Sequence, residues 1–336
     1  MKIGPLDFGQ YPLFLAPMED VTDLIFRRLC KEYGADMVYT EFVNSDGLIR
    51  NVKKLHDKTL FSPDERPIGI QLYGQCPESM KEAALMAEQK SPDLIDINFG
   101  CPVKKIASRG AGSGMLKNIP LMVEITRTIA GAVKLPVTVK TRLGWDENSI
   151  CIEEIAEKLQ ECGIQALTVH ARTRSQLFKG RADWSWIRKI KDHPRIRIPI
   201  IGNGDIDSPE KAKEAFEIYH ADGVMIGRAA IGRPWIFKEI KYFLQTGNKL
   251  HPLSVKEIVA VARQHFCQLI EYKGEKSAIY GMRRHFVHYF KGLPSFRDMK
   301  IKLLTSLDVN EIFHLLDQIA EFYGKFVPLQ ENIQDN

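Results

Sequence analysis

The chain contains 336 residues, of which 44% are hydrophobic and 26% charged, and its formal net charge is +5. This composition is that of a globular protein and excludes a wholly disordered, collagen-like or low-complexity chain, while the length suggests about two domains or one large barrel with an appendage. No apolar run approaches the ~18 residues that a membrane helix requires, so no membrane span is expected.

The cysteines and the N-terminus both favour the cytoplasm. Six cysteines are too few for a disulfide scaffold, and no CxxC pair is present, which argues against a zinc knuckle, any similar metal site or a thioredoxin-like motif. Residues 1–10 lack the basic segment followed by an apolar one that a secretory signal would need. We therefore expect a protein of the reducing cytoplasm.

Short apolar or β-branched runs recur through the first two-thirds of the chain, and each ends in a polar or glycine-bearing turn. These candidate strands occupy residues 13–18, 37–42, 68–74, 94–100, 136–142, 166–172, 198–204 and 223–229. Most neighbouring runs are separated by enough residues for one helix. Helical patterns lie at 22–33, 77–89, 119–130, 149–162 and 209–219.

Alternating strands and helices with nearly continuous apolar strands favour a parallel sheet covered on both faces. Eight such units fit a closed (β/α)8 TIM barrel. The alternative, an open doubly wound sheet, usually shows a G-x-G-x-x-G turn after its first strand. The first run here leads instead into Pro17-Met18-Glu19-Asp20, so we predict the barrel.

The pattern changes after about residue 247. Strand-like runs disappear, and residues 255–272, 278–290 and 310–323 have helical apolar spacing. We therefore predict a barrel domain over residues 1–247 and a small α-helical domain over residues 248–330. The polar tail, residues 331–336, is expected to be frayed.

In a TIM barrel, the residues that end the strands share one mouth, where the chemistry is found. The polar and turn residues at these predicted positions are Pro17, Met18, Gln71, Asn98, Cys101, Lys140, Arg142, His170, Arg172, Asn203, Gly204, Asp205, Gly227 and Arg228.

The turns after the last two strands indicate a phosphate ligand. Gly202 and Gly204 flank Asn203 and let the backbone approach an anion, and Arg228 adds a guanidinium after Gly227. Either turn alone would suit a tight barrel turn with a surface arginine. Both together, at the strands where barrels bind phosphate, favour the phosphorylated ligand.

Two further residues fit a flavin, although each also has an ordinary interpretation. A lysine at position 140 would stabilise charge near N1 and O2 of a reduced flavin, and Gln71 can both donate and accept at the ring edge. Taken alone, they could equally be a solvated lysine and a glutamine at the rim of the core. Cys101 lies in a Gly100-Cys101-Pro102 turn, unlike the cysteines with helical spacing. The glycine-rich segment 109–114 is interpreted as a mobile loop.

The predicted helical domain is strongly basic. Residues 273–302 hold eight Lys or Arg residues against two acidic ones, a local net charge of +6. Such a density, which includes Arg283 and Arg284, favours an RNA partner over an ordinary basic helix face. The interleaved aromatic residues could stack on bases, but a buried aromatic stripe is the more common explanation.

Several motifs together resemble one family. Ala16-Pro17-Met18, the segment Asp96-Ile97-Asn98-Phe99-Gly100-Cys101-Pro102, and the strand ends that carry Lys140, His170, Asn203 and Gly227 are similar to those of tRNA-dihydrouridine synthases, closest to the DusB-like branch. The likeness spans nearly the whole chain, and N-x-G-C-P is its most specific element.

The resemblance implies an FMN-dependent oxidoreductase with NADPH as reductant and tRNA as substrate. The residues that would carry FMN are Pro17, Met18, Gln71, Lys140, His170, Asn203, Gly204, Asp205, Gly227 and Arg228. The residues that would contact the RNA are Asn98, Arg142, Arg172, Arg283 and Arg284. A flipped uridine would receive a hydride at C6 from the flavin and a proton at C5 from Cys101.

Two other functions remain open from the sequence. A dihydroorotate dehydrogenase-like FMN barrel acting on a free pyrimidine would share the flavin-binding residues but would not need a basic helical domain. A barrel that binds RNA without chemistry would not need Cys101, Lys140 and His170 together, which weighs against it.

Overall fold

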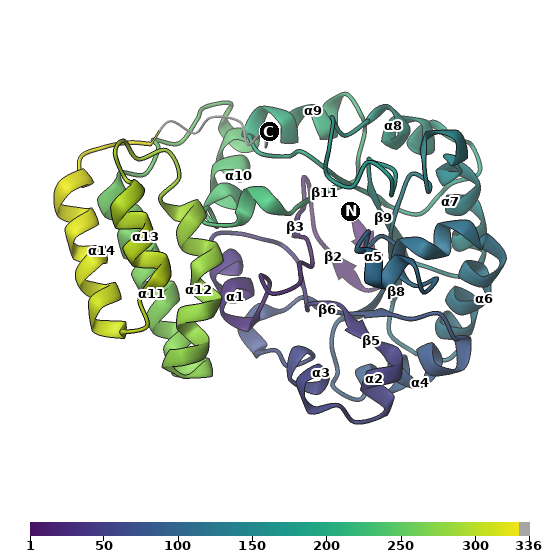
Figure 1. Cartoon of the computed structure of the whole chain (residues 1–336). Helices are drawn as coiled ribbons and strands as arrows, with labels where there is room; N and C mark the ends of the chain where they lie inside the picture. Colours follow the sequence, from purple (N-terminus) through teal and green to yellow (C-terminus); the bar gives the residue numbers. More distant parts are fainter. Residues whose placement is uncertain (329–336) are drawn as a thin grey trace.

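The structure, a computed structural model, describes residues 1–328, and its central feature is a closed parallel barrel (Figure 1). The hydrogen-bonded path runs β3-β11-β10-β9-β8-β7-β6-β4. A parallel bridge between Phe14 and Met37 closes the ring, and the amide of Leu15 donates to the carbonyl of Met37 at 2.9 Å. The predicted TIM barrel is therefore confirmed.

Each barrel strand falls within a predicted apolar run. The strands are β3 (Leu13–Leu15), β4 (Val38–Tyr39), β6 (Ile68–Tyr73), β7 (Leu94–Asn98), β8 (Val137–Arg142), β9 (Ala166–His170), β10 (Ile200–Asn203) and β11 (Gly223–Ile226). A short strand β5 (Val43–Asn44) also pairs with β6. Every residue of β7 and β9 is buried, as expected of a parallel strand covered on both faces.

The base of the barrel is filled and capped by apolar side chains. Phe14, Tyr39, Leu94 and Ile201 meet there in one buried cluster. An N-terminal hairpin of β1 (Lys2–Ile3) and β2 (Leu6–Asp7) adds Ile3 to this cluster. Sequence analysis did not predict the hairpin, because strands of two residues are too short to show an alternating pattern.

Helices surround the barrel and reproduce the predicted alternation. They are α1 (Leu24–Glu32), α2 (Ser45–Ile49), α3 (Lys53–Lys58), α4 (Pro77–Glu88), α5 (Lys104–Ala107), α6 (Ile119–Ala130), α7 (Ile152–Glu161), α8 (Ser185–Asp192), α9 (Pro209–Glu217) and α10 (Ile236–Thr246). N-caps set several starts: Asp23, Asn118 and Ser208 each accept a hydrogen bond from an amide three residues later.

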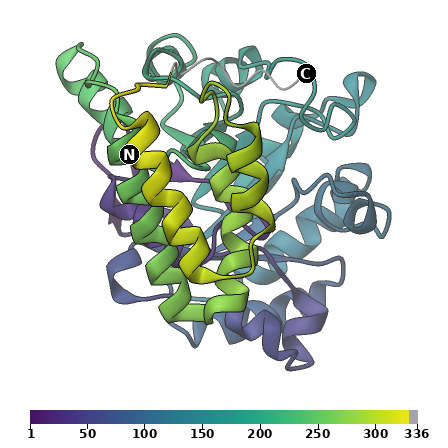
Figure 2. The ribbon, with the colours of Figure 1, turned by 60° about the vertical axis from the view of Figure 1, so that its left-hand side comes forward.

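The C-terminal part is an all-helical bundle that stands beside the barrel, and Figure 2 shows its helices side by side. They are α11 (Val255–Lys273), α12 (Glu275–Tyr289), α13 (Arg297–Thr305) and α14 (Val309–Tyr323). Helix α13 was not predicted, because Leu303 is its one buried residue and its apolar pattern is weak. Gly247, at φ +74°, ends α10 beside the predicted domain boundary, which stays a prediction. The predicted frayed tail, residues 331–336, lies outside the described residues.

The bundle meets the barrel mainly at α1. The ring of Phe26 lies 5.7 Å from His265 and 4.6 Å from His285, centroid to centroid. Polar contacts surround these rings: Lys273 pairs with Asp23 at 2.7 Å. Among residues 1–328, no helix combines the length and apolar character needed to cross a bilayer.

The two buried histidines predict a loss of stability in acid. Burial lowers the pKa of His265 to about 4 and holds the pKa of His285 well below its ordinary value of 6.5. Unfolding lets both rings take up a proton, so stability is complete above pH 6.5 and falls as the pH drops from 6.5 toward 4. We expect the protonation of unfolded His265 to lower the free energy of unfolding by about 2 kcal/mol at pH 5, and His285 to lower it further in the same direction.

Urea unfolding at pH 7 and pH 5 measures this effect. His285→Phe should lose less stability than the wild type between the two pH values. His314→Gln removes an exposed histidine of α14 and should behave as the wild type does. An unchanged pH dependence in His285→Phe would contradict the assignment.

Candidate active site

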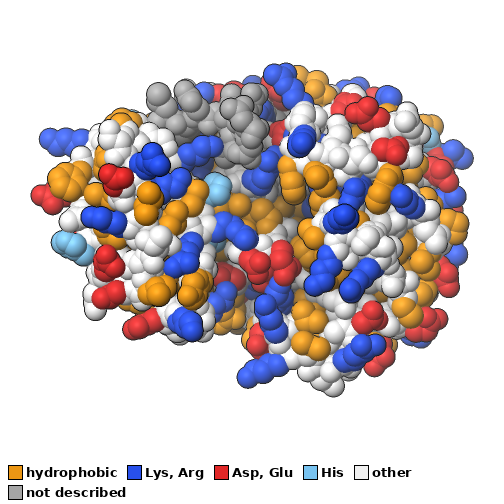
Figure 3. Space-filling view, in the orientation of Figure 1, with side chains coloured by type: hydrophobic (Ala, Val, Ile, Leu, Met, Phe, Trp, Pro, Cys, Tyr) orange, Lys and Arg blue, Asp and Glu red, His pale blue; other side chains and the backbone are white. Residues whose placement is uncertain are grey.

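A cavity of about 400 Å³ opens at the carboxyl ends of the barrel strands. Figure 3 shows the molecule hollowed between the barrel and the helical bundle, with Lys and Arg side chains around the opening. The predicted site residues that line it are Pro17, Met18, Asn98, Cys101, Lys140, Arg142, His170, Arg172, Asn203, Gly204, Asp205, Gly227, Arg228 and Arg284. Gln71 and Arg283 are not among its lining residues.

Gln71 lies beneath the cavity in a buried hydrogen-bond network. Its amide nitrogen donates to Asp96 at 2.5 Å, and its amide oxygen accepts from Asn98 at 2.9 Å. Thr138 donates to the second oxygen of Asp96 at 2.5 Å. Both ends of the Gln71 amide are therefore used inside the protein. Asp96 was not predicted as a site residue, although a carboxylate inside an apolar strand is an available signal.

This network fixes the turn that carries Cys101. The side-chain oxygen of Asn98 accepts from the amides of Gly100 and Cys101, each at 2.9 Å. The Cys101 carbonyl accepts from the amide and hydroxyl of Ser113, at 3.1 and 2.8 Å. Burial raises the pKa of the Cys101 thiol, which is 7% exposed, so it is protonated at neutral pH.

The glycine-rich segment 109–114, interpreted from the sequence as a mobile loop, is largely packed inside the protein. Residues 111–116 are buried, and η2 (Gly112–Lys117) packs behind Cys101. A Cβ atom on Gly112, whose φ is +55°, would lie 3.2 Å from the Cβ atom of Cys101. Glycine is needed there because the two backbones approach closely. The segment supports the Cys101 turn.

Four cationic side chains of the barrel crowd the cavity: Lys140, Arg142, Arg172 and Arg228. Burial, with Arg142 nearby, lowers the pKa of Lys140 to about 8, and its ammonium donates to Asn203 at 3.1 Å. Burial and these same cations hold the pKa of His170 well below its ordinary value, so the imidazole is neutral. Such a cavity favours an anionic ligand.

Arg142 and Arg172, both predicted to contact substrate, also hold the loop of residues 173–180. Arg142 donates to the carbonyls of Gly100, Thr173 and Leu177 at 2.9 to 3.0 Å. Arg172 donates to the carbonyls of Lys179 and Gly180 at 3.2 and 2.6 Å. These bonds explain how two guanidinium groups can be 2% and 1% exposed.

The same loop presents Phe178 to the cavity. The ring lies 5.7 Å from the guanidinium carbon of Arg142 and 5.2 Å from that of Arg228, and its side chain is 52% exposed. Sequence analysis did not find Phe178, because nothing in its neighbours marks a loop aromatic as facing a cavity.

Asp205 organises the end of the cavity predicted to bind phosphate. It accepts from Arg172 at 2.6 Å, from the amide of Ala182 at 2.8 Å and from Arg228 at 3.4 Å. Gly204 precedes it with φ +131°, and a Cβ there would lie 2.8 Å from Ala182. At this end of the cavity, the backbone of Gly204 therefore lies near an arginine, Arg228, that Asp205 orients.

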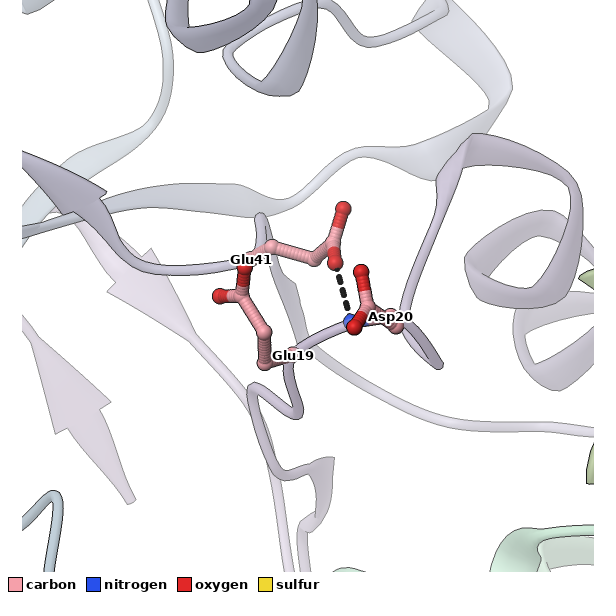
Figure 4. Close-up of side chains that lie close together, drawn as sticks. All are labelled: Glu19, Asp20 and Glu41. Carbon is pink, nitrogen blue, oxygen red and sulfur yellow. Dashed lines mark hydrogen bonds between the residues drawn. The ribbon is translucent and has the colours of Figure 1, made fainter. Parts of the chain in front are cut away.

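An acidic cluster lies beside the cavity, which one of its members, Glu19, lines. Figure 4 shows Glu19, Asp20 and Glu41 together, with the amide of Asp20 donating to Glu41. The ammonium of Lys58 bonds to Glu19 and lies 3.6 Å from Glu41. The protein thus supplies a cation to this cluster itself.

Within residues 1–328, the helical bundle contributes one side chain to the lining of the cavity. Arg284 lines the cavity and donates to the carbonyl of Glu19 at 3.0 Å. Arg283 instead lies over the ring of Tyr280, 4.6 Å from its centroid.

Comparison with known proteins gives a consistent result. The family model described as dihydrouridine synthase (Dus) matches residues 14–320. A Rickettsia conorii protein named probable tRNA-dihydrouridine synthase is 38% identical over 326 residues, which cover 96% of each chain. A Shewanella oneidensis protein named tRNA-dihydrouridine synthase B is 41% identical over 292 residues, 86% of this chain and 89% of its own.

Solved structures share the barrel at much lower identity. Histamine dehydrogenase from Rhizobium sp. 4-9 matches 79% of this chain with a TM-score of 0.54 and 13% identity, and 50% of its own chain is covered. A 2-naphthoyl-CoA reductase matches 72% with a TM-score of 0.55 and 13% identity, and 51% of its own chain is covered. At such identity the likeness shows the fold alone.

The position of Asp205 predicts a stability cost when its charge is removed. Asp205→Asn would leave the buried Arg172 without its carboxylate, so the free energy of unfolding should fall by about 1–3 kcal/mol. Urea unfolding of the flavin-free protein measures this. Asp192→Asn, which breaks the exposed pair with Arg188, should change stability by less than about 0.5 kcal/mol. Equal unfolding midpoints for both variants would refute the prediction.

Proposed function

The chain belongs to the dihydrouridine synthase family, and we propose that it reduces uridines of tRNA to 5,6-dihydrouridine with FMN as its cofactor. The observation that carries this proposal is the protonated, buried thiol of Cys101 at the edge of a cavity lined by five cationic side chains, four from the barrel and Arg284 from the bundle. The enzyme is an oxidoreductase, and its uridine substrate has to leave the RNA stack to reach this cavity.

The cavity fits FMN in volume, charge and backbone shape. About 400 Å³ is within the usual range for a small-molecule site. Asn203, Gly204, Gly227 and Arg228 would hold the phosphate, with Asp205 orienting Arg228. Bound FMN supplies the hydride in its reduced form, which NADPH regenerates.

The other lining residues would hold the flavin ring. Pro17 and Met18 offer apolar surface beside it. Lys140 provides positive charge, and the neutral His170 can donate or accept a hydrogen bond. Gln71 would act through Asn98, because both ends of its amide are already bonded.

Cys101 acts as the general acid that protonates C5 of the uracil. Its raised pKa keeps the proton on sulfur at neutral pH, and the bonds from Asn98 and Ser113 hold its backbone in place. Arg142 uses Nε and Nη1 in its bonds to carbonyls, so Nη2 is available to the substrate. Arg172 and Phe178 complete the substrate side of the cavity.

The helical bundle provides the grip on tRNA. Arg284 stands at the cavity, and exposed cations of α12, α13 and the turn between them continue from it: Lys276, Lys291, Arg297, Lys300 and Lys302. Phe286, Tyr289 and Phe296 are buried, so they form a core stripe and do not stack on bases. The enzyme works in the cytoplasm, where its tRNA is found.

Replacing Cys101, the proposed acid, should abolish most uridine reduction while leaving the reduction of FMN by NADPH intact. Cys101→Ala should retain bound FMN and its reduction by NADPH but lose about 10²- to 10⁴-fold in dihydrouridine formation, because general acid catalysis typically contributes that much. Dihydrouridine in a tRNA lacking the modification is quantified after incubation with NADPH.

Cys76→Ala is the matched control. Cys76 also precedes a proline in a turn, but it lies outside the cavity lining and its thiol bonds to Glu78. It should leave dihydrouridine formation unchanged. Full turnover by Cys101→Ala would remove Cys101 from its role.

A further inference from the structure

We propose that a second cavity, behind the turn that carries Cys101, binds a backbone phosphate of the tRNA beside the reacting uridine. This inference rests on the proposed function. The rear cavity, as it is called below, measures about 630 Å³. Residues from the segment 104–118 line one side, and Gln75, Trp145 and Arg174 line the other.

The rear cavity has the charge of an anion site. Lys104, Lys117 and Arg174 line it, and none of its lining residues is acidic among those described. Within residues 1–328, none of these three cations is ion-paired with a carboxylate. Three unneutralised cations around one hollow attract an anion strongly, and phosphate is the anion that RNA presents at every nucleotide.

Trp145 holds two of the three cations in position. The ammonium of Lys117 lies 3.8 Å from the indole centroid, and the guanidinium carbon of Arg174 lies 4.6 Å from it. The Nε atom of Arg174 is buried with no hydrogen-bond partner among the described residues. A buried donor without an acceptor is costly, and a phosphate oxygen would satisfy it.

The rear cavity shares its walls with the active site. Gly114 and Met115 line the rear cavity. The preceding residue, Ser113, donates a hydrogen bond to the carbonyl of Cys101. Arg174 follows Thr173, whose carbonyl accepts from Arg142. A phosphate bound here would therefore contact the two segments that position Cys101 and Arg142.

The neighbouring surface continues the same charge. Lys105 and Arg109 are exposed on the segment that also carries Lys104. The rear cavity adjoins the turn that carries Cys101, so we infer that the backbone of an RNA whose uridine enters the active site is the source of the phosphate. The alternative source of the same chemistry is a phosphate of NADPH.

The double variant Lys104→Gln/Lys117→Gln tests the inference in the FMN-loaded full chain. Both side chains are exposed, so the fold should be unaffected. Lys189→Gln is the matched control, because Lys189 also lies over a tryptophan, 3.9 Å from the Trp186 centroid, but on the outer wall of the barrel. The probes are unmodified tRNA over a series of salt concentrations and NADPH in the absence of tRNA.

The double variant should bind tRNA about tenfold more weakly, and the slope of log Kd against log salt should become shallower by about one. The rate of flavin reduction by NADPH should match that of the wild type. Lys104→Arg/Lys117→Arg should restore affinity, and Lys189→Gln should leave both readouts unchanged.

Two results would overturn the inference. Unchanged Kd and salt slope in the double variant would show that no tRNA phosphate is bound there. A raised KM for NADPH with an unchanged tRNA slope would assign the rear cavity to the dinucleotide instead. Failure of the wild type to form dihydrouridine would overturn the proposed function separately, because the tRNA binding measurement does not require turnover.

Discussion

The chemistry of this molecule depends on the register of three neighbouring parallel strands. The pairing of β6 with β7 places Gln71 opposite Asp96, and the pairing of β7 with β8 places Asn98 opposite Lys140. These side chains meet because parallel strands in a closed barrel cannot slip without turning their buried faces outward. The result is a buried network that ends at the amide of Cys101, so the position of the thiol is fixed by backbone pairing deep in the barrel.

A second constraint is electrostatic. Lys140, Arg142, Arg172 and Arg228 are brought together with Asp205 as the carboxylate that bonds to two of them. Burial, and after it the neighbouring cations, depress the pKa values of Lys140 and His170, so further positive charge is unfavourable at this place. A phosphorylated cofactor would relieve the repulsion between these cations. The same repulsion that destabilises the protein without the cofactor would therefore strengthen the binding of an anion. The neutral His170 also leaves Cys101 without an adjacent imidazolium that would pull its pKa down.

The sequence predicted the features that follow from local pattern. Apolar runs found every barrel strand, and helix α6 begins and ends at the predicted residues, because Asn118 caps it and Pro120 follows. The expectation that residues at the ends of the strands share one mouth identified most of the predicted site residues that line the cavity. Gln71 does not line the cavity, because its side chain bonds to Asp96 on the neighbouring strand, a buried partner that local spacing does not reveal. Its role in flavin binding stays a prediction. Phe178 and the rear cavity depend on loops folded back by buried arginines, a tertiary effect that no periodicity records.

The arrangement of charge around the mouth also limits how RNA can lie on the protein. Glu19, Asp20 and Glu41 border the cavity with one neutralising ammonium, that of Lys58, bonded among them. A phosphodiester would be repelled there, whereas cations stand on both flanks: Lys104 and Lys117 on the barrel rim, and Arg284 with α13 on the bundle. Because the bundle is tied to α1 by the rings around Phe26, the distance between these two flanks is set by packing and not by the RNA. If the rear cavity binds a tRNA phosphate as proposed, the strand that carries the reacting uridine would contact cations of the barrel and of the bundle, and its phosphates would avoid the carboxylates of the acidic cluster.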